Sequence, residues 1–175
     1  NSFIMSKQEL IKRLIEIEVI NAGQFRLKNA GQSTIYVDIK KSYGYPDILR
    51  KISYLMNQEI DKKTTVIAAQ GLGAIPLATA LSKDYNYKLT MVREKQKDHG
   101  IQRKLEGYIP NKEDWVFIVD DVYSTGDSIR EVIEALEPTQ AQITGCGVVV
   151  NRDQIGLGLN PYHLMTLEEL LKQGK

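Results

Sequence analysis

Two adjacent carboxylates, Asp120 and Asp121, are the residues with the clearest chemical potential in this chain. They follow the apolar run 116–119 and precede a short loop, 124–128, that is rich in Ser, Thr and Gly. Two acceptors held at the end of a strand suit the vicinal hydroxyls of a sugar, because each can accept a hydrogen bond. The loop adds backbone N–H groups, hydroxyls and a helix N-terminus, which together suit a phosphate. A diol beside a phosphate indicates a ribose 5-phosphate ligand.

A second group of candidate residues lies in the polar stretch 93–107, where Arg93, Lys97 and His99 follow the pattern Arg-x-x-x-Lys-x-His-Gly. A charge run of this kind is commonly a solvated loop. If the neighbouring site binds a pyrophosphate, however, a basic flap would stabilise the charge that gathers on the leaving group. A flap that closes would also keep water away from the reacting sugar carbon.

A glycine-containing loop, Gln70-Gly-Leu-Gly-Ala74, follows the short apolar run 66–69 and precedes a helical pattern. Two glycines in such a turn are weak evidence alone, because many turns between a strand and a helix need them for steric reasons. Beside a ribose site, the same loop could present backbone amides to a pyrophosphate.

The elements that must position these residues form an alternating pattern, which predicts a parallel sheet covered by helices on both faces. We expect the first helix to begin with the capping box Ser6 and Glu9 and to end at Gly23, and a second capping box, Thr166 and Glu169, to open a short C-terminal helix. The stretch 93–107 lacks periodicity and is expected to be a mobile loop. The remaining expected elements are strands 34–39, 66–69, 89–92, 116–119 and 143–150, and helices starting at Pro46, Ile75 and Ile129.

Size and composition are those of one soluble domain spanning residues 1–175, with 42% hydrophobic and 26% charged residues. A net charge of +1 provides no basic field for nucleic acid. No apolar run approaches the length that spans a membrane, and the N-terminus lacks a signal-peptide pattern. The lone Cys146 excludes an internal disulfide and lies in an apolar run, which favours a buried thiol in a reducing cytoplasm.

The run 116–128 resembles the signature by which type I phosphoribosyltransferases bind phosphoribosyl pyrophosphate (PRPP). The loop 93–100 and the segment 69–78 resemble the catalytic loop of the orotate phosphoribosyltransferases and the pyrophosphate loop of the wider family. Segments 23–36 and 148–152 resemble the parts of the orotate enzymes that form the base pocket. This resemblance implies an α/β fold of the type I phosphoribosyltransferase kind. It would have a mostly parallel central sheet flanked by helices, a flexible catalytic loop, and a small hood from residues 1–40 and the C-terminal segment.

The resemblance also implies roles for individual residues. Lys97, Asp120 and Asp121 would be catalytic, and Lys28, Tyr36, Ser124 and Arg152 would bind orotate. PRPP would be bound by Gln70, Gly71, Leu72, Gly73, Arg93, Lys97, His99, Asp120, Asp121, Val122, Tyr123, Ser124, Thr125, Gly126, Asp127 and Ser128. The sequence departs from the family pattern at Glu94, where a second basic residue is usual, and at Asp127, a carboxylate in the predicted cradle for the 5'-phosphate.

The implied activity is the transfer of ribose 5-phosphate from PRPP to orotate, giving orotidine 5'-monophosphate and pyrophosphate in pyrimidine synthesis. The implied cofactor is Mg²⁺, held mainly through PRPP and water rather than by direct protein ligands. The implied assembly is a homodimer whose basic loops reach the neighbouring active site. Two alternatives remain at this point: a phosphoribosyltransferase for another nucleobase, and a PRPP-sensing regulator without catalysis.

Overall fold

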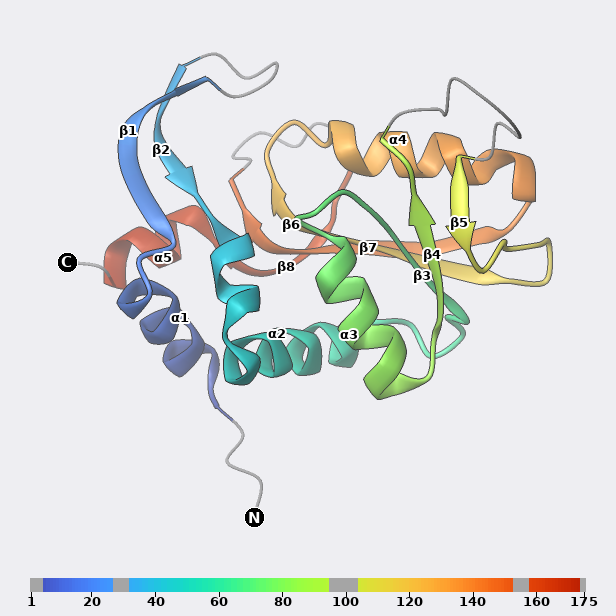
Figure 1. Ribbon diagram of the computed structural model, residues 1–175, viewed down its shortest axis with the longest axis horizontal. Coiled ribbons are helices and arrows are strands. Elements are labelled where there is room, and N and C mark those ends of the chain that lie inside the picture. The colour runs from blue at the N-terminus through green and yellow to red at the C-terminus, as the bar shows by residue number, and fades with distance from the viewer. Residues whose placement is uncertain (1–4, 27–31, 95–103, 153–157, 174–175) are drawn as a thin grey trace.

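The computed structural model describes residues 5–26, 32–94, 104–152 and 158–173, and the side chains of these residues other than 22–34. Its centre is a six-stranded sheet in the order β5-β4-β3-β6-β7-β8 (Figure 1). Strand β5 runs antiparallel to β4, and all other neighbours are parallel, as the alternating pattern predicted. The strands are β3 (Val66–Gln70), β4 (Lys88–Val92), β5 (Leu105–Gly107), β6 (Trp115–Tyr123), β7 (Gln142–Asn151) and β8 (Tyr162–Thr166).

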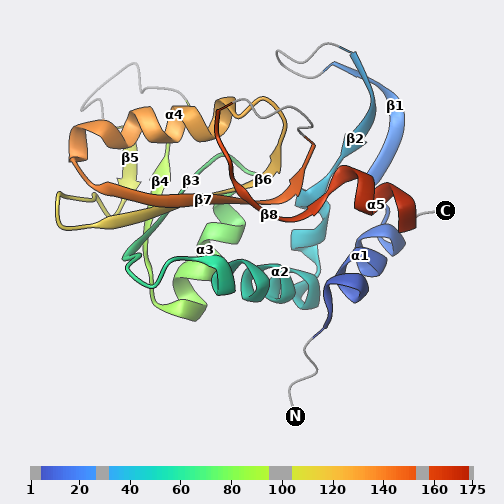
Figure 2. The ribbon, with the colours of Figure 1, turned by 180° about the vertical axis from the view of Figure 1, so that it is seen from behind.

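Helices cover both faces of this sheet. Helices α2 (Pro46–Glu59) and α3 (Ile75–Tyr85) lie on one face, and α4 (Asp127–Leu136) lies on the other (Figures 1 and 2). Successive side chains of β6 point to opposite faces of the sheet. Phe117 packs in the core under α2 and α3, and Val116 packs in the core under α4. The middle residues of the central strands are therefore apolar on both faces, which explains their continuous hydrophobic runs.

A smaller antiparallel ribbon of β1 (Ile20–Arg26) and β2 (Gln32–Val37) stands apart from the main sheet (Figure 1). Helix α1 (Lys7–Glu16) precedes the ribbon and packs against the C-terminal helix α5 (Leu167–Gln173), with Lys7 and Glu169 forming an ion pair of 3.0 Å. A 3-10 helix, η1 (Ile39–Gly44), leads from β2 into α2, and a second, η2 (Glu137–Thr139), follows α4. Both predicted capping boxes are confirmed, at Ser6 and at Thr166.

Two expectations about the elements were wrong, and two further strands were not predicted. Helix α1 ends at Glu16, and Gly23 lies inside β1, because the chain turns at Glu18 with a φ of +59° and no glycine marks that turn. The stretch 93–107 is not wholly a loop: its last residues form β5, too short for a visible alternation, while residues 95–103 lie outside the described ranges. Strands β1 and β8 were not predicted.

No helix within the described ranges combines the length and the apolar character needed to cross a bilayer.

Candidate active site

The acidic pair lies inside β6 rather than after it. The strand was expected to end at residue 119 but continues to Tyr123, because β7 runs alongside and Asp120 pairs with Val148. Asp120 is 8% exposed, and the side chain of Asp121 is 16% exposed. The amide of Asp121 donates to Asp120 Oδ1 at 2.8 Å, and the amide of Val122 donates to Asp121 Oδ1 at 2.8 Å. Both carboxylates are thus fixed near the carboxyl end of the strand.

Burial and the neighbouring charge of Asp121 raise the pKa of Asp120 well above its ordinary value. The amide hydrogen bond and the cationic Lys40 act in the opposite direction and only partly offset this rise. Negative charge at this pair is therefore costly until a ligand supplies hydrogen-bond donors or positive charge. A ribose offers both, because its hydroxyls donate and its ring becomes cationic as a glycosidic bond breaks.

The glycine loop lies directly against the acidic pair. After Gln70 the chain turns at Gly71, with a φ of +82°, and enters α3 at Ile75. A Cβ on Gly73 would lie 2.6 Å from Asp121 Cγ, so a side chain at this position would collide with the carboxylate. The structure therefore brings together two of the predicted motifs, and the absence of a side chain at Gly73 permits their contact.

The predicted 5'-phosphate loop turns at Gly126, which has a φ of +82° and on which a Cβ would lie 2.9 Å from the ring of Tyr123. Helix α4 begins at Asp127, two residues before the predicted start at Ile129. The carboxylate of Asp127 lies 3.7 Å from Arg130, which also donates to the carbonyl of Thr125 at 2.7 Å. Arg130 thus offsets the negative charge that Asp127 brings to the helix N-terminus.

The predicted base residues that the structure describes lie around the same edge. Arg152 directly follows β7, and its amide donates to the carbonyl of Tyr123 at 2.8 Å. Burial lowers the pKa of Arg152, so its cationic form is less favoured than in water. Tyr36, on β2, accepts a hydrogen bond of 3.0 Å from Lys40. Lys28, a third predicted base residue, lies outside the described residues, as do the loop residues Lys97 and His99.

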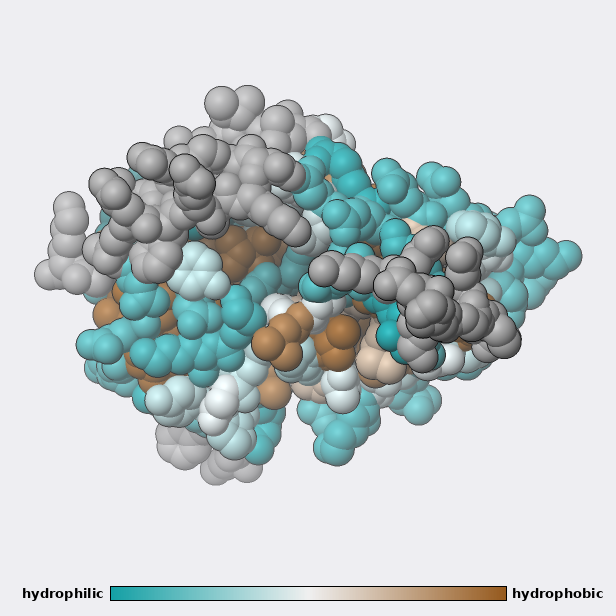
Figure 3. Space-filling model, turned by 45° about the horizontal axis from the view of Figure 1, so that its top comes forward, coloured by the Kyte–Doolittle hydropathy of each residue, from teal (hydrophilic) through white to brown (hydrophobic). Residues whose placement is uncertain are grey.

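A pocket of about 640 Å³ opens beside the glycine loop. Arg93 borders it and donates to Glu106 Oε1 at 2.7 Å, and Glu94 Oε1 lies 2.6 Å from where a Cβ on Gly71 would stand. Leu72 is 77% exposed, and hydrophobic side chains gather near the middle of the face drawn in Figure 3. The lining residues are Gly71, Leu72, Ile75, Pro76, Met91, Val92, Arg93, Glu94 and Glu106.

Sequence reasoning missed Lys40 and Tyr43, both on η1. Lys40 Nζ lies 3.9 Å from Asp121 Oδ2, and Tyr43 Oη donates to the carbonyl of Gly73 at 2.7 Å. Burial, followed by the charges of Asp121 and Asp120, raises the pKa of Tyr43 well above its ordinary value, which keeps this hydroxyl a donor. No pattern marks these residues, because Lys40 and Lys41 are equivalent until the course of η1 is known.

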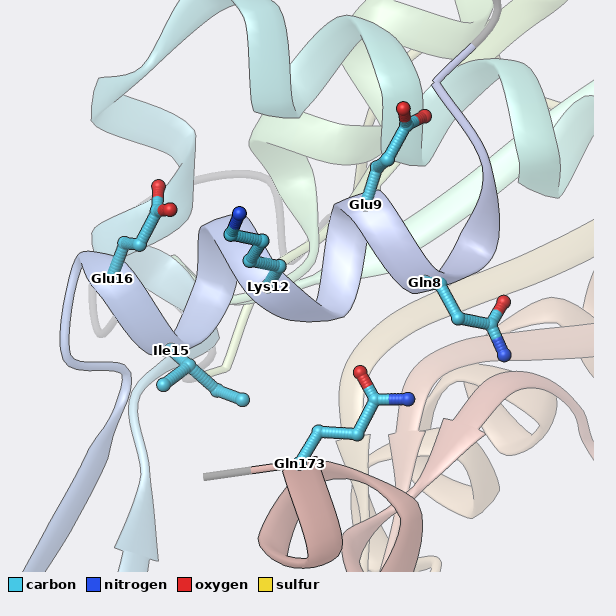
Figure 4. A pocket seen from close by; sticks show the side chains of 6 residues that line it. All are labelled: Gln8, Glu9, Lys12, Ile15, Glu16 and Gln173. Atoms are coloured by element: carbon cyan, nitrogen blue, oxygen red, sulfur yellow. The ribbon is translucent and has the colours of Figure 1, made fainter. Parts of the chain in front are cut away.

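A second pocket, of about 550 Å³, lies between α1 and the end of α5 (Figure 4). Its lining mixes both signs of charge and contains none of the predicted site residues: Gln8, Glu9, Lys12, Ile15, Glu16 and Gln173. Within the described part of the chain, no three His, Cys, Asp or Glu side chains gather as a metal-binding cluster.

Comparisons with known proteins agree with this geometry. Residues 38–163 match the model of the phosphoribosyl transferase domain family. The chain is 38% identical to the orotate phosphoribosyltransferase of Pyrococcus furiosus, covering 85% of this chain and 82% of that one. It is 36% identical to the Pyrococcus horikoshii enzyme of the same name, covering 95% and 94%. The crystal structure of orotate phosphoribosyltransferase from Aeropyrum pernix superposes with a TM-score of 0.80 at 25% identity, covering 94% and 97%.

Proposed function

Because the chain belongs to the orotate phosphoribosyltransferase family, we propose that it transfers the ribose 5-phosphate group of PRPP to N1 of orotate. The products are orotidine 5'-monophosphate and pyrophosphate, as pyrimidine nucleotide synthesis requires. The observation that carries this proposal is the packing of Asp121 against Gly73, which joins a diol-binding pair to a loop suited to pyrophosphate. The type I phosphoribosyltransferase fold is the frame on which these two motifs meet.

The acidic pair acts on the ribose. The bond between ribose C1 and the pyrophosphate oxygen breaks, its electrons leave with pyrophosphate, and the lone pair of orotate N1 forms the new bond to C1. Positive charge grows on the sugar between these events. Asp120 and Asp121 accept hydrogen bonds from the 2- and 3-hydroxyls, and their negative charge stabilises the cationic ring more than the neutral ground state.

The two ends of PRPP are held by backbone groups. Gln70 to Gly73 present amides to the pyrophosphate as the chain turns into α3. Residues 122–128 and the first turn of α4 surround the 5'-phosphate, with the hydroxyls of Ser124, Thr125 and Ser128 as additional donors. Arg130 is an added cation at this end of the site, beside Asp127.

The base is selected by charge. Orotate carries a carboxylate that purine bases and uracil lack, and Arg152, at the end of β7, is the cation that pairs with it. Tyr36 and Lys28 complete the base pocket from the ribbon of β1 and β2. We propose that this ribbon, together with α1 and α5, is the hood that covers the base within a single domain of residues 1–175.

Mg²⁺ is the cofactor that the family implies, and the described residues fit a cation that arrives with its substrate. Within the described ranges, no third His, Cys, Asp or Glu gathers with Asp120 and Asp121 as a metal-binding cluster, and Lys40 already lies 3.9 Å from Asp121. Bound to the pyrophosphate and ribose oxygens of PRPP, Mg²⁺ would lower the charge that the glycine loop must accept.

The basic loop neutralises the leaving pyrophosphate through Arg93, Lys97 and His99, and we propose that it does so in the neighbouring subunit of a homodimer. Lys97→Ala and Asp121→Asn should each give a nearly inactive homodimer. Mixing them under conditions of subunit exchange should restore activity, because one site of the heterodimer then has neither defect. If mass spectrometry confirms exchange and activity does not return, the loop acts within its own subunit.

One assay tests the reaction itself: PRPP and Mg²⁺ with orotate, uracil, adenine or hypoxanthine, with release of pyrophosphate as the measurement. Orotate should be converted at least about 100-fold faster than uracil, which lacks only the carboxylate. Preference for another base would favour a different phosphoribosyltransferase, and PRPP binding without turnover of any base would favour a regulator.

A cytoplasmic location is proposed on the lone, half-buried Cys146, which suits a reducing compartment.

A further inference from the structure

Lys40 is the only lysine of η1 that reaches the site, and its ammonium group lies between the ribbon of β1 and β2 and the acidic pair. Lys40 Nζ is 3.0 Å from Tyr36 Oη and 3.9 Å from Asp121 Oδ2. A third oxygen, Asp38 Oδ1, lies 3.7 Å away. Tyr36 and Asp38 immediately precede η1 in the chain, whereas Asp121 lies on β6, so the lysine joins the segment from β2 to η1 to the central sheet.

The surroundings keep this ammonium charged. Burial alone would lower the pKa of Lys40, but the hydrogen bond to Tyr36 and the charge of Asp121 outweigh it, and the pKa is raised. The side chain of Lys40 is 35% exposed and that of Asp121 only 16%, so the attraction between them is less screened than in a surface pair.

The carboxylate of Asp121 is held from three sides. Its Oδ1 accepts a hydrogen bond of 2.8 Å from the amide of Val122, and its Oδ2 faces Lys40. On the third side the backbone of Gly73 packs against the carboxylate, which is possible because glycine has no Cβ. Removing the lysine would leave Oδ2 without its cation, and rotation of the carboxylate would then turn an oxygen away from the ribose.

We propose that Lys40 is a positioning residue for the transfer reaction: it fixes the Asp121 carboxylate for the ribose hydroxyls and connects it to Tyr36 of the base pocket. This inference rests on the proposed function. Through the Tyr36–Lys40–Asp121 chain, the base site and the PRPP site share one hydrogen-bonded and ionic connection. Binding of one substrate therefore favours binding of the other, because a base that orders Tyr36 also orders the carboxylate that receives the ribose.

The test compares Lys40→Met and Lys40→Arg with Lys41→Met, the neighbouring lysine of the same 3-10 helix, which is exposed. Binding of PRPP with Mg²⁺ is measured by calorimetry, alone and with a saturating orotate analogue in which carbon replaces N1, so that no transfer occurs. Lys40→Met should weaken PRPP binding about tenfold, because the Asp121 carboxylate loses its one charge-assisted contact with Lys40. It should also abolish the tightening of PRPP binding by the orotate analogue. Lys40→Arg should restore most of both effects, and Lys41→Met should match the wild type.

A double-mutant cycle separates positioning from direct contact. If Lys40 acts through Asp121, adding Lys40→Met to Asp121→Asn should weaken PRPP binding no further. Additive losses would overturn the proposal and make Lys40 a direct PRPP ligand. Unchanged PRPP binding in Lys40→Met, with the thermal midpoint within about 2 °C of wild type, would overturn it as well. Because PRPP binding is measured without any base, a wrong assignment of orotate as substrate would appear in the base panel and leave the PRPP-alone and double-mutant readouts standing.

Discussion

Two buried aspartates at opposite ends of β6 have opposite electrostatic surroundings. Asp114, just before the strand, is 5% exposed, and both of its oxygens accept hydrogen bonds: from Thr65 at 2.9 Å, from Tyr108 at 2.7 Å and from the amide of Asn111 at 3.0 Å. Burial would raise its pKa, but the hydrogen bond of Tyr108 and the others outweigh it, and the pKa is lowered. Asp120, near the other end, is 8% exposed, and burial and Asp121 raise its pKa.

The difference separates stability from function. At the amino end of the sheet, the protein itself satisfies the charge, so Asp114 stabilises the fold. At the carboxyl end, burial and the charge of Asp121 disfavour the ionised form of Asp120, and the proposed ligand would favour it. Sites that bind charged intermediates commonly keep such costs in the free protein. Substitutions at the two ends should therefore have opposite consequences.

The largest expected effect is at the carboxyl end. Asp121→Asn keeps the shape of the side chain but removes the charge that stabilises a cationic ribose, and turnover should fall at least about 100-fold. The thermal midpoint should change little, because the lost attraction to Lys40 is offset by the lost repulsion with Asp120. Steady-state kinetics and calorimetry check both. Near-normal turnover in a folded variant would rule out the role assigned to Asp121.

A smaller effect is expected for Arg152→Ala, at the same edge. Losing one charge-assisted contact costs about 2 kcal/mol, so the KM for orotate should rise about 30-fold while the KM for PRPP changes little. The control is uracil, which has no carboxylate and should be used equally poorly by both proteins. An equal rise in both Michaelis constants would show that Arg152 serves the PRPP site or the fold.

How far the sequence predicted this arrangement differs between the two ends. The chemistry of the carboxyl end was visible in residues 116–128, because paired acids, a glycine turn and a helix start are adjacent in sequence, and the parallel sheet followed from the apolar runs. Contacts between distant segments were not visible. The approach of Gly73 to Asp121 depends on where the loop after β3 lies, and the placement of Lys40 depends on where η1 lies. Neither position can be read from the sequence.

The amino end was missed for a similar reason. Tyr108 and Asn111 are close to Asp114 in sequence but belong to no periodic pattern, and the third donor, Thr65, lies on a distant segment. The sequence does not predict strand β8, because its five residues, Tyr162–Thr166, include His163 and a threonine and so form no continuous apolar run. The predicted roles of Lys28, Lys97 and His99 stay predictions, since these residues lie outside the described ranges.

Asp114→Asn tests the amino end and should lower stability without lowering activity. With the NH₂ group of the amide toward Asn111, two donors would face each other. With its NH₂ group toward Thr65, the hydroxyl must reverse to accept, and Tyr108 and Asn111 then donate to an uncharged oxygen in place of a carboxylate. The expected loss is about 2 kcal/mol, or about 6 °C in the thermal midpoint for a chain of this size. Calorimetry gives the midpoint, and turnover at 25 °C should match the wild type. Unchanged stability would mean that these hydrogen bonds contribute nothing net.

The smallest and most discriminating effect is the pH dependence of stability, because the two aspartates act on opposite sides of the ordinary carboxyl pKa of 3.8. Asp114 has a lowered pKa in the folded state, so its contribution is complete above 3.8 and is lost as pH falls through the lowered value. Asp120 has a raised pKa, so it costs nothing at low pH, and its cost develops as pH rises from 3.8 to the raised value.

Urea denaturation between about pH 3 and pH 8 should therefore separate the two variants by the sign and the window of their difference from wild type. Asp120→Asn should be more stable than wild type by about 1 kcal/mol at neutral pH, because a neutral amide avoids burying the charge. That advantage should shrink as the pH falls toward the ordinary carboxyl pKa. Asp114→Asn should be less stable at neutral pH, and its deficit should persist to lower pH before it shrinks. If Asp120→Asn is less stable than wild type at neutral pH, the fold itself satisfies the Asp120 carboxylate. The proposal that Asp114 serves stability and Asp120 serves ligand binding would then be wrong.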